Sequence, residues 1–112
     1  MAIQVKSLAC MALPTSDGEL YVLPANKAAV VKNIRLLNTT GSQVTVNLYI
    51  KRGAGGTSFR ITKASEPIAA NTLWVDDKEV TLEYVNPNAD RITGSASAAG
   101  VDCVISGIER DA

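Results

Sequence analysis

Apolar and polar residues alternate with a period of two along most of the chain, which is the period of a β-strand with one buried face. The alternation is clearest in residues 43–50 and recurs in residues 58–62, 79–84 and 91–96. The residues expected on the core faces of these segments are Val44, Val46, Leu48, Ile50, Phe59, Ile61, Val80, Leu82, Tyr84, Ile92, Gly94 and Ala96. We expect each segment to be a strand whose other face meets water or a partner.

Two further apolar segments depart from simple alternation. The expected core face of residues 28–37 carries Val30, Ile34 and Leu36. Lys32 falls in the same phase, so either a β-bulge lies near Lys32 or that end of the strand lies at a rim where the ammonium reaches water. Residues 101–108 are apolar on both sides, which predicts a strand that is central or covered by a neighbouring chain.

Turn-forming residues separate these segments at short intervals. The turns are predicted at residues 16–18, 24–26, 40–42, 53–56, 66–67, 86–88 and 99–100. Several short strands at such spacing favour an all-β, single-domain antiparallel β-sandwich of jelly-roll or immunoglobulin-like type. We expect residues 1–18 to form an N-terminal arm or a first strand, and residues 19–112 to form the sandwich domain.

Composition narrows the possible functions. The 112 residues suit one domain, and 46% of them are hydrophobic but only 4% aromatic, so the core must come from aliphatic side chains. With 11 basic and 11 acidic residues the formal net charge is zero, which disfavours nucleic-acid binding and suits a subunit packed against others. Histidine is absent, which removes the commonest general base and zinc ligand. We therefore expect neither an enzyme nor a cofactor site.

The two cysteines and the N-terminus give no sign of secretion. Cys10 and Cys103 are expected to be small buried hydrophobes, and the alternative is a disulfide joining the two ends of the domain. Residues 6–14 (KSLACMALP) have too short an apolar stretch for a secretory signal, and no apolar run reaches the roughly 20 residues of a membrane span. The expected site of synthesis is the cytoplasm, with no membrane partner.

Two polar segments are candidates for chemical sites. The glycine-rich residues 53–58 lie between strand-like runs and lack a Lys before Thr57, so they predict a hairpin tip rather than a phosphate-binding loop. The nearby cations that suit an acidic partner are Lys51, Arg52 and Arg60. The acidic residues Asp76, Asp77, Glu79 and Glu83 follow no calcium-loop spacing, and we expect most of them to be solvated, with no metal.

Three aromatic residues are out of phase with their apolar neighbours. If Leu73 and Val75 face the core, Trp74 faces outward, where tryptophan often anchors an interface; the alternative is a partly covered residue beside a loop. Tyr21 and Tyr49 are expected to face outward for the same reason. The predicted partner interface therefore consists of Lys51, Arg52, Arg60, Trp74, Tyr21 and Tyr49.

The order of several short segments resembles a type of small β-sandwich protein found in the virions of tailed bacteriophages. These segments are residues 20–26 (LYVLPAN), 30–34 (VVKNI), 38–40 (NTT), 67–72 (PIAANT), 88–92 (NADRI) and 105–109 (ISGIE). The resemblance covers about residues 20–109. Ala89 stands where similar proteins usually have Gly, so that turn departs from the pattern.

The resemblance implies a structural role in the virion and brings no catalytic residue. Our leading expectation is a head decoration (cement) protein that bridges major capsid subunits and self-associates in small symmetric clusters such as trimers. One alternative is a tail, neck or fibre-attachment protein. Another is a receptor- or carbohydrate-binding module on the virion surface, for which Trp74 is the candidate stacking residue. The expected location is the virion, assembled in the host cytoplasm.

Overall fold

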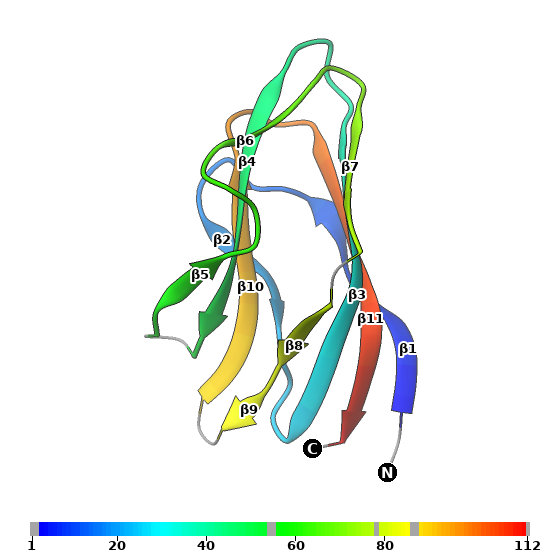
Figure 1. Cartoon of the computed structure of the whole chain (residues 1–112), viewed down its shortest axis with the longest axis vertical. Helices are drawn as coiled ribbons and strands as arrows, with labels where there is room; N and C mark the ends of the chain where they lie inside the picture. Colours follow the sequence, from blue (N-terminus) through cyan, green and yellow to red (C-terminus); the bar gives the residue numbers. More distant parts are fainter. Residues whose placement is uncertain (1–2, 54–55, 78, 86–87, 112) are drawn as a thin grey trace.

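The chain folds into two antiparallel β-sheets packed face to face (Figure 1), and the predicted single-domain β-sandwich is confirmed. The computed structural model describes residues 3–53, 56–77, 79–85 and 88–111, and this part of the chain contains strands but no helix. The segment expected to be an arm or a first strand contains β1, Ile3–Ala12, which pairs antiparallel with the C-terminal strand β11, Val101–Asp111.

Three long strands dominate the first sheet, and two dominate the second. The first sheet has the order β1-β11-β3-β7, with β8 also paired to β3; its further bounds are β3 Lys27–Asn38, β7 Leu73–Asp76 and β8 Val80–Leu82. The second sheet has the order β2-β10-β4-β5, with β6 paired to β4 and β9 to β10. Its bounds are β2 Gly18–Val22, β10 Asn88–Ala96, β4 Val44–Arg52, β5 Ser58–Arg60, β6 Glu66–Ile68 and β9 Tyr84–Val85.

Aliphatic side chains fill the space between the sheets. The fully buried ones include Leu23, Val31, Ile34, Leu36, Val46, Leu48, Ile68, Leu82, Ile92, Val101 and Ile105. The alternation predicted for β4 is confirmed, since its buried positions are every second residue from Val44 to Ile50. β11, which the sequence predicted to be apolar on both sides, is a central strand between β1 and β3. This agrees with the first of the two explanations given for residues 101–108.

A β-bulge at Lys32 resolves the conflict within β3. Ser106 pairs with Asn33 but Gly107 pairs with Val31, so Lys32 is the extra residue on the longer side. The bulge changes which residues face inward. Val31 is buried on one side of it and Ile34 on the other, whereas Val30, expected on the core face, is only half-buried.

Gly107 lies opposite this bulge, where the two backbones come close together. A Cβ atom added there would lie well inside van der Waals distance of the backbone carbonyl oxygen of Val30. Only glycine fits without moving the backbone of β3. The bulge and the glycine across from it therefore form one structural unit.

The prediction for residues 58–62 was partly wrong. Phe59 pairs with the buried Ile50, so its side chain lies on the inner side of the second sheet. It is nevertheless 54% exposed, because β5 lies at the edge of that sheet, away from the first sheet (Figure 1). Thr62, expected to point outward, is buried, and its hydroxyl accepts a hydrogen bond from the Leu48 backbone N–H at 3.2 Å.

A buried amide joins the end of β3 to the segments that follow β6 and precede β4. The side chain of Asn38 is fully buried, and its Nδ2 donates to the carbonyl oxygens of Ser42 (2.9 Å), Ile68 (3.0 Å) and Ala69 (3.1 Å). Its Oδ1 accepts from the backbone N–H and the hydroxyl of Thr40 at 2.9 and 2.7 Å. Asn38 thus ties the two sheets together at one end of the sandwich.

Candidate interaction surfaces

The outer side of the first sheet exposes large apolar side chains in adjacent strands. Leu73 on β7 pairs with Leu37 on β3, and Val75 on β7 pairs with Arg35. Paired residues point to the same side of a sheet, so these side chains form one surface. Leu37, Leu73 and Val75 are 39%, 44% and 46% exposed.

Two opposite charges lie within this surface. On β11, Asp102 pairs with Leu37 and the half-buried Val104 pairs with Arg35. Both charged side chains are exposed, and neither has an ion-pair partner in the part of the chain that the structure describes. A shallow depression lies among these side chains. We call this surface the apolar outer face and define it as Arg35, Leu37, Leu73, Val75, Asp102 and Val104.

The outer side of the second sheet is mostly polar, although Val22 on β2, which pairs with Arg91, is exposed there. Tyr49 on β4 pairs with Arg60 on β5, and the Arg60 guanidinium carbon lies 4.9 Å from the centre of the Tyr49 ring. The same guanidinium donates to Oδ1 of Asn47 at 2.9 Å. Lys51 has no ion-pair partner among the described residues.

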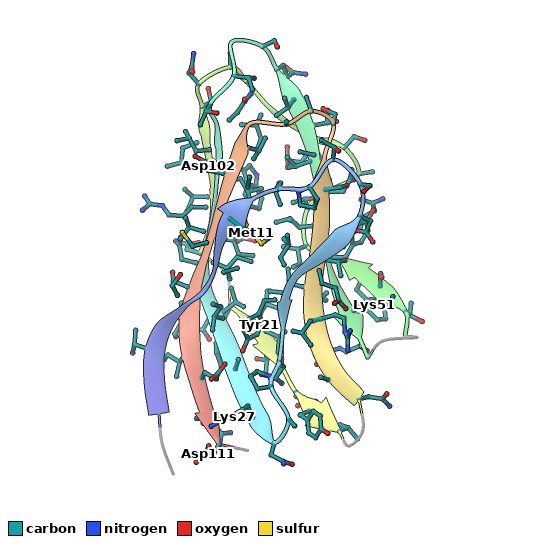
Figure 2. The ribbon with its side chains drawn as sticks, turned by 180° about the vertical axis from the view of Figure 1, so that it is seen from behind. Met11, Tyr21, Lys27, Lys51, Asp102 and Asp111 are labelled. Atoms are coloured by element: carbon teal, nitrogen blue, oxygen red, sulfur yellow. The ribbon has the colours of Figure 1, made fainter. Side chains whose placement is uncertain are left out.

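Glu19 and Arg91 complete this surface as an ion pair between β2 and β10. We call it the polar outer face and define it as Glu19, Asn47, Tyr49, Lys51, Arg60 and Arg91. It brings together Lys51, Tyr49 and Arg60 of the residues predicted to contact a partner. Figure 2 shows Lys51 and Asp102 on opposite sides of the molecule.

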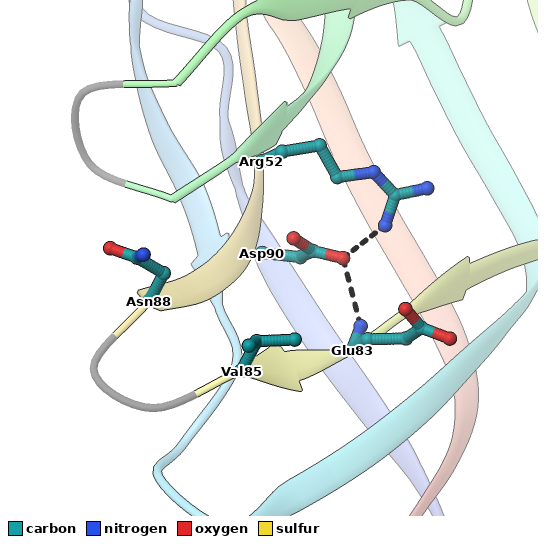
Figure 3. A pocket seen from close by; sticks show the side chains of 5 residues that line it. All are labelled: Arg52, Glu83, Val85, Asn88 and Asp90. Atoms are coloured by element: carbon teal, nitrogen blue, oxygen red, sulfur yellow. Dashed lines mark hydrogen bonds and ion pairs between the residues drawn. The ribbon is translucent and has the colours of Figure 1, made fainter.

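Arg52, another predicted contact residue, is held by an ion pair with Asp90, a carboxylate that is 6% exposed (Figure 3). The same carboxylate oxygen accepts from the backbone N–H of Glu83 at 2.9 Å. Together with Val85 and Asn88 these residues line a pocket. Because the arginine and an N–H group already satisfy the carboxylate, we interpret it as a structural link between β10 and the segment joining β8 to β9.

Tyr21 does not face outward as predicted. It pairs with Ile92 and therefore points toward the first sheet (Figure 2). Its hydroxyl donates to Oε2 of Glu109 on β11 at 2.6 Å, and Glu109 is only 5% exposed. Burial first, and the Glu109 carboxylate second, raise the pKa of Tyr21 above its usual value. Tyr21 thus links the two layers.

Trp74 also faces inward, which corrects the prediction that it points away from the core. It pairs with the buried Leu36 and packs against the core, while Leu73 and Val75 face outward. The prediction assumed that Leu73 and Val75 decide which side of β7 faces the core. The large indole buries more apolar surface than either of them, and β7 adopts the phase that covers it.

The cysteines also differ from the prediction in part. Cys103 is fully buried as expected, but Cys10 is exposed, and both are free thiols. Cys10 pairs with Val104 while Met11 pairs with Cys103, so the two thiols point to opposite sides of the sheet and cannot form a disulfide. Burial first, and the proximity of Cys10 second, raise the pKa of the Cys103 thiol to about 12.

The described acidic residues and the described ends of the glycine loop form no metal-binding group. Glu79 forms an ion pair with Lys32 at the bulge, and within the described ranges no group of acidic, Cys or His side chains could hold a metal. The predicted hairpin tip includes residues 54 and 55, which lie outside the described residues, and the strands on either side pair as a hairpin, Lys51 with Ser58. None of the described segments is a helix long and apolar enough to cross a membrane.

Sequence reasoning missed the apolar outer face. The one available signal was the pair Leu36-Leu37, because consecutive residues in a strand point to opposite sides and one leucine had to face outward. The neighbours that complete the surface come from other strands and depend on the register. Comparison with models of known protein families gave no match, and neither did comparison with curated proteins.

Proposed function

We propose that the protein is a structural subunit of a bacteriophage virion, most specifically a head decoration protein that bridges major capsid subunits. One observation carries this proposal: the two outer faces of the sandwich have different chemistry and lie on opposite sides of the molecule. A subunit that must contact two kinds of neighbour at once needs such an arrangement. The resemblance to small phage sandwich proteins supports the virion as the setting.

The polar outer face is the surface proposed to meet the capsid shell. Lys51 and Arg60 give it positive charge that suits an acidic surface. The Tyr49 ring and the Asn47 amide already hold the Arg60 guanidinium in place. An ordered arginine loses less side-chain entropy on binding than a mobile one, so this group is suited to form a contact.

Repetition makes weak contacts sufficient for a decoration protein. Many copies on a symmetric shell, each held at several points, bind with a high effective concentration. The zero net charge of the chain keeps repulsion between neighbouring copies low. We propose neither catalysis nor a cofactor. The inward position of Trp74 removes the ring on which the carbohydrate-binding alternative depended.

The proposal is tested by adding the purified protein to undecorated shells of the phage that encodes it. We expect stoichiometric co-sedimentation and a gain in the temperature at which the shells break. Lys51→Glu combined with Arg60→Glu is expected to weaken binding at least tenfold, whereas Arg110→Glu, a charge reversal on an exposed residue of β11, serves as the control. Absence of binding by the unaltered protein rejects the decoration role.

The tail, neck and fibre-attachment alternative predicts a different location for the same chain. Gold-labelled antibodies against the protein, applied to intact particles, separate the two positions. Label on the head supports decoration, and label confined to the tail supports the alternative.

A further inference from the structure

We propose that the apolar outer face binds a second copy of this chain in a two-fold contact, with Arg35 of each copy paired to Asp102 of the other. The contact specifies how copies of the chain associate within the proposed virion role, as a two-fold dimer in place of the trimer first expected, and in that sense it rests on the proposed function. It is tested on the isolated protein, so its failure and the failure of shell binding are distinguishable.

The apolar outer face has the exposure expected of a surface that is covered in the working state. Single exposed hydrophobic residues are ordinary, but adjacent ones that form a patch mark interaction sites. Leu37, Leu73 and Val75 are neighbours across the β3-β7 pairing and are each between 39% and 46% exposed. Val104 extends the patch onto β11. These four side chains therefore form one apolar patch that solvent reaches.

The two charges are arranged in a self-complementary way. Asp102 pairs with Leu37, and Val104 pairs with Arg35, so the four residues occupy the corners of a block with the charges on one diagonal and the aliphatic residues on the other. Strand spacing is about 4.8 Å and same-side residues are about 6.8 Å apart along a strand, so the sides of the block are similar in length.

The proposed two-fold axis lies between the two facing sheets and runs along the line from Leu37 to Val104. A rotation of 180° about it exchanges the positions of Arg35 and Asp102. Each Arg35 then lies opposite Asp102 of the partner subunit, and two ion pairs form by symmetry. Leu37 and Val104 lie on the axis and each meets its own copy. The strands of the two sheets cross at a large angle, which is one of the two known ways in which sheets pack.

This symmetry favours a second copy over an unrelated partner. A surface with one cation and one anion, neither paired within the described residues, is neutral, and the same surface inverted satisfies both charges. An anionic membrane would be repelled by Asp102, and a partner of one dominant charge would leave one of the two groups desolvated and unpaired. An isologous dimer avoids both penalties.

The central test is charge exchange, measured by sedimentation velocity over a range of concentrations. The unaltered protein is expected to dimerise, and Arg35→Asp and Asp102→Arg are each expected to weaken dimerisation at least tenfold because they place like charges opposite each other. Mixing the two variants one to one is expected to restore a heterodimer, since each new carboxylate or guanidinium then faces a group of opposite charge. Arg110→Asp, a charge reversal outside the apolar outer face, is the control and is expected to dimerise normally.

Alkylation of Cys10 gives a second readout on the unaltered chain. Cys10 lies beside Val104 in the register and is exposed, whereas Cys103 is buried and serves as the internal reference. Its alkylation is expected to slow as the chain concentration rises through the dimerisation range. A protein that stays monomeric up to about 1 mM overturns the proposal. So does a dimer that survives both single charge reversals, or one in which the Cys10 rate is independent of concentration.

Discussion

The two sheets bury similar aliphatic faces but present opposite kinds of surface to the outside. On the second sheet the outward side chains contact one another: Arg60 lies over Tyr49, and Arg91 pairs with Glu19. On the first sheet Leu37 and Leu73, which pair with each other, are 39% and 44% exposed. The two outer sides of one sandwich can therefore differ in chemistry. We expect another molecule to bind on the side that exposes apolar residues.

The two sheets also differ in the regularity of their longest strand pairs. β10 and β4 pair from Asp90 to Ala96 without a shift in register, so inward and outward positions alternate strictly. In the first sheet the register shifts between β3 and β11 and again between β1 and β11. Each bulge moves residues from one side of the sheet to the other. The second sheet has a register shift too, between β2 and β10, but its central β4-β10 pair is regular.

The largest effect on stability is expected from adding a methyl group opposite the β-bulge of β3. Gly107→Ala places Cβ against the Val30 carbonyl oxygen, which is backbone and cannot turn away. We expect the free energy of unfolding to fall by about 3 kcal/mol, the upper part of the range for overpacking. Urea titration followed by circular dichroism measures the change.

Two other glycines make this test comparative. Gly94→Ala on β10 of the second sheet meets a Leu48 methyl carbon at 2.5 Å and the Asn47 carbonyl oxygen at 2.9 Å, and part of that clash can be relieved by turning the leucine. We expect a smaller loss there. At Gly41 nothing lies within 4 Å of the added atom, so Gly41→Ala is expected to change stability by less than about 0.5 kcal/mol. Equal losses at Gly107 and Gly41 would show that the bulge imposes no constraint.

A second test compares two asparagines of different burial. Asn38→Ala removes a fully buried amide and leaves the Thr40 N–H and the Ile68 carbonyl without their partner, for an expected loss of about 2 kcal/mol. Asn47→Ala on the polar outer face frees Arg60 and the Ser65 N–H to bind water, and we expect a loss of about 0.5 kcal/mol. Thermal unfolding of both variants beside the parent protein measures the difference, and equal losses would contradict it.

The sequence predicted the architecture better than the orientation of its short strands. Alternation over a long, regular strand such as β4 identifies the inward residues, and the phase conflict at Lys32 correctly offered a bulge as one explanation. Trp74 and Tyr21 were placed on the wrong side. In β7, only four residues long, the phase depends on the partner strand rather than on local alternation.

The candidate surfaces could be predicted only in part, for a related reason. Lys51 and Tyr49 lie on one long strand, so their shared outward side could be read from spacing alone. Arg35 and Asp102 stand on different strands, and only the register of β3 against β11 makes them neighbours. Long-range pairing of this kind leaves no signal in a single sequence.

Alkaline pH probes the interior that both sheets share. The pKa values of Tyr21, on the second sheet, and Cys103, on the first, are raised in the folded protein, so folding favours their protonated forms. Their stabilising effect is complete below the pKa values of the unfolded chain. It is lost as the pH rises from about 9 toward 12, where the unfolded chain releases protons that the folded chain keeps.

The expected result is a free energy of unfolding that falls above about pH 9, by at most about 1.4 kcal/mol per pH unit for each proton involved. Tyr21→Phe removes one of the two groups together with its hydrogen bond to Glu109, so its decline above about pH 10 is expected to be shallower. Urea titrations at a series of pH values provide the measurement. A decline of the same steepness in both proteins would remove Tyr21 from this account.

The smallest expected effect separates outward side chains that support the fold from those that are free to bind. Arg60→Ala removes the contact with the Tyr49 ring, for which we expect a loss of about 0.5–1 kcal/mol at an exposed site. Lys51→Ala is the neighbouring control, with an expected change of less than about 0.5 kcal/mol. A double-mutant cycle of Arg60→Ala with Tyr49→Leu isolates the pair. A coupling energy near zero would mean that the Tyr49 ring does not hold Arg60 in advance, and the case for a prearranged contact would then rest on the hydrogen bond to Asn47.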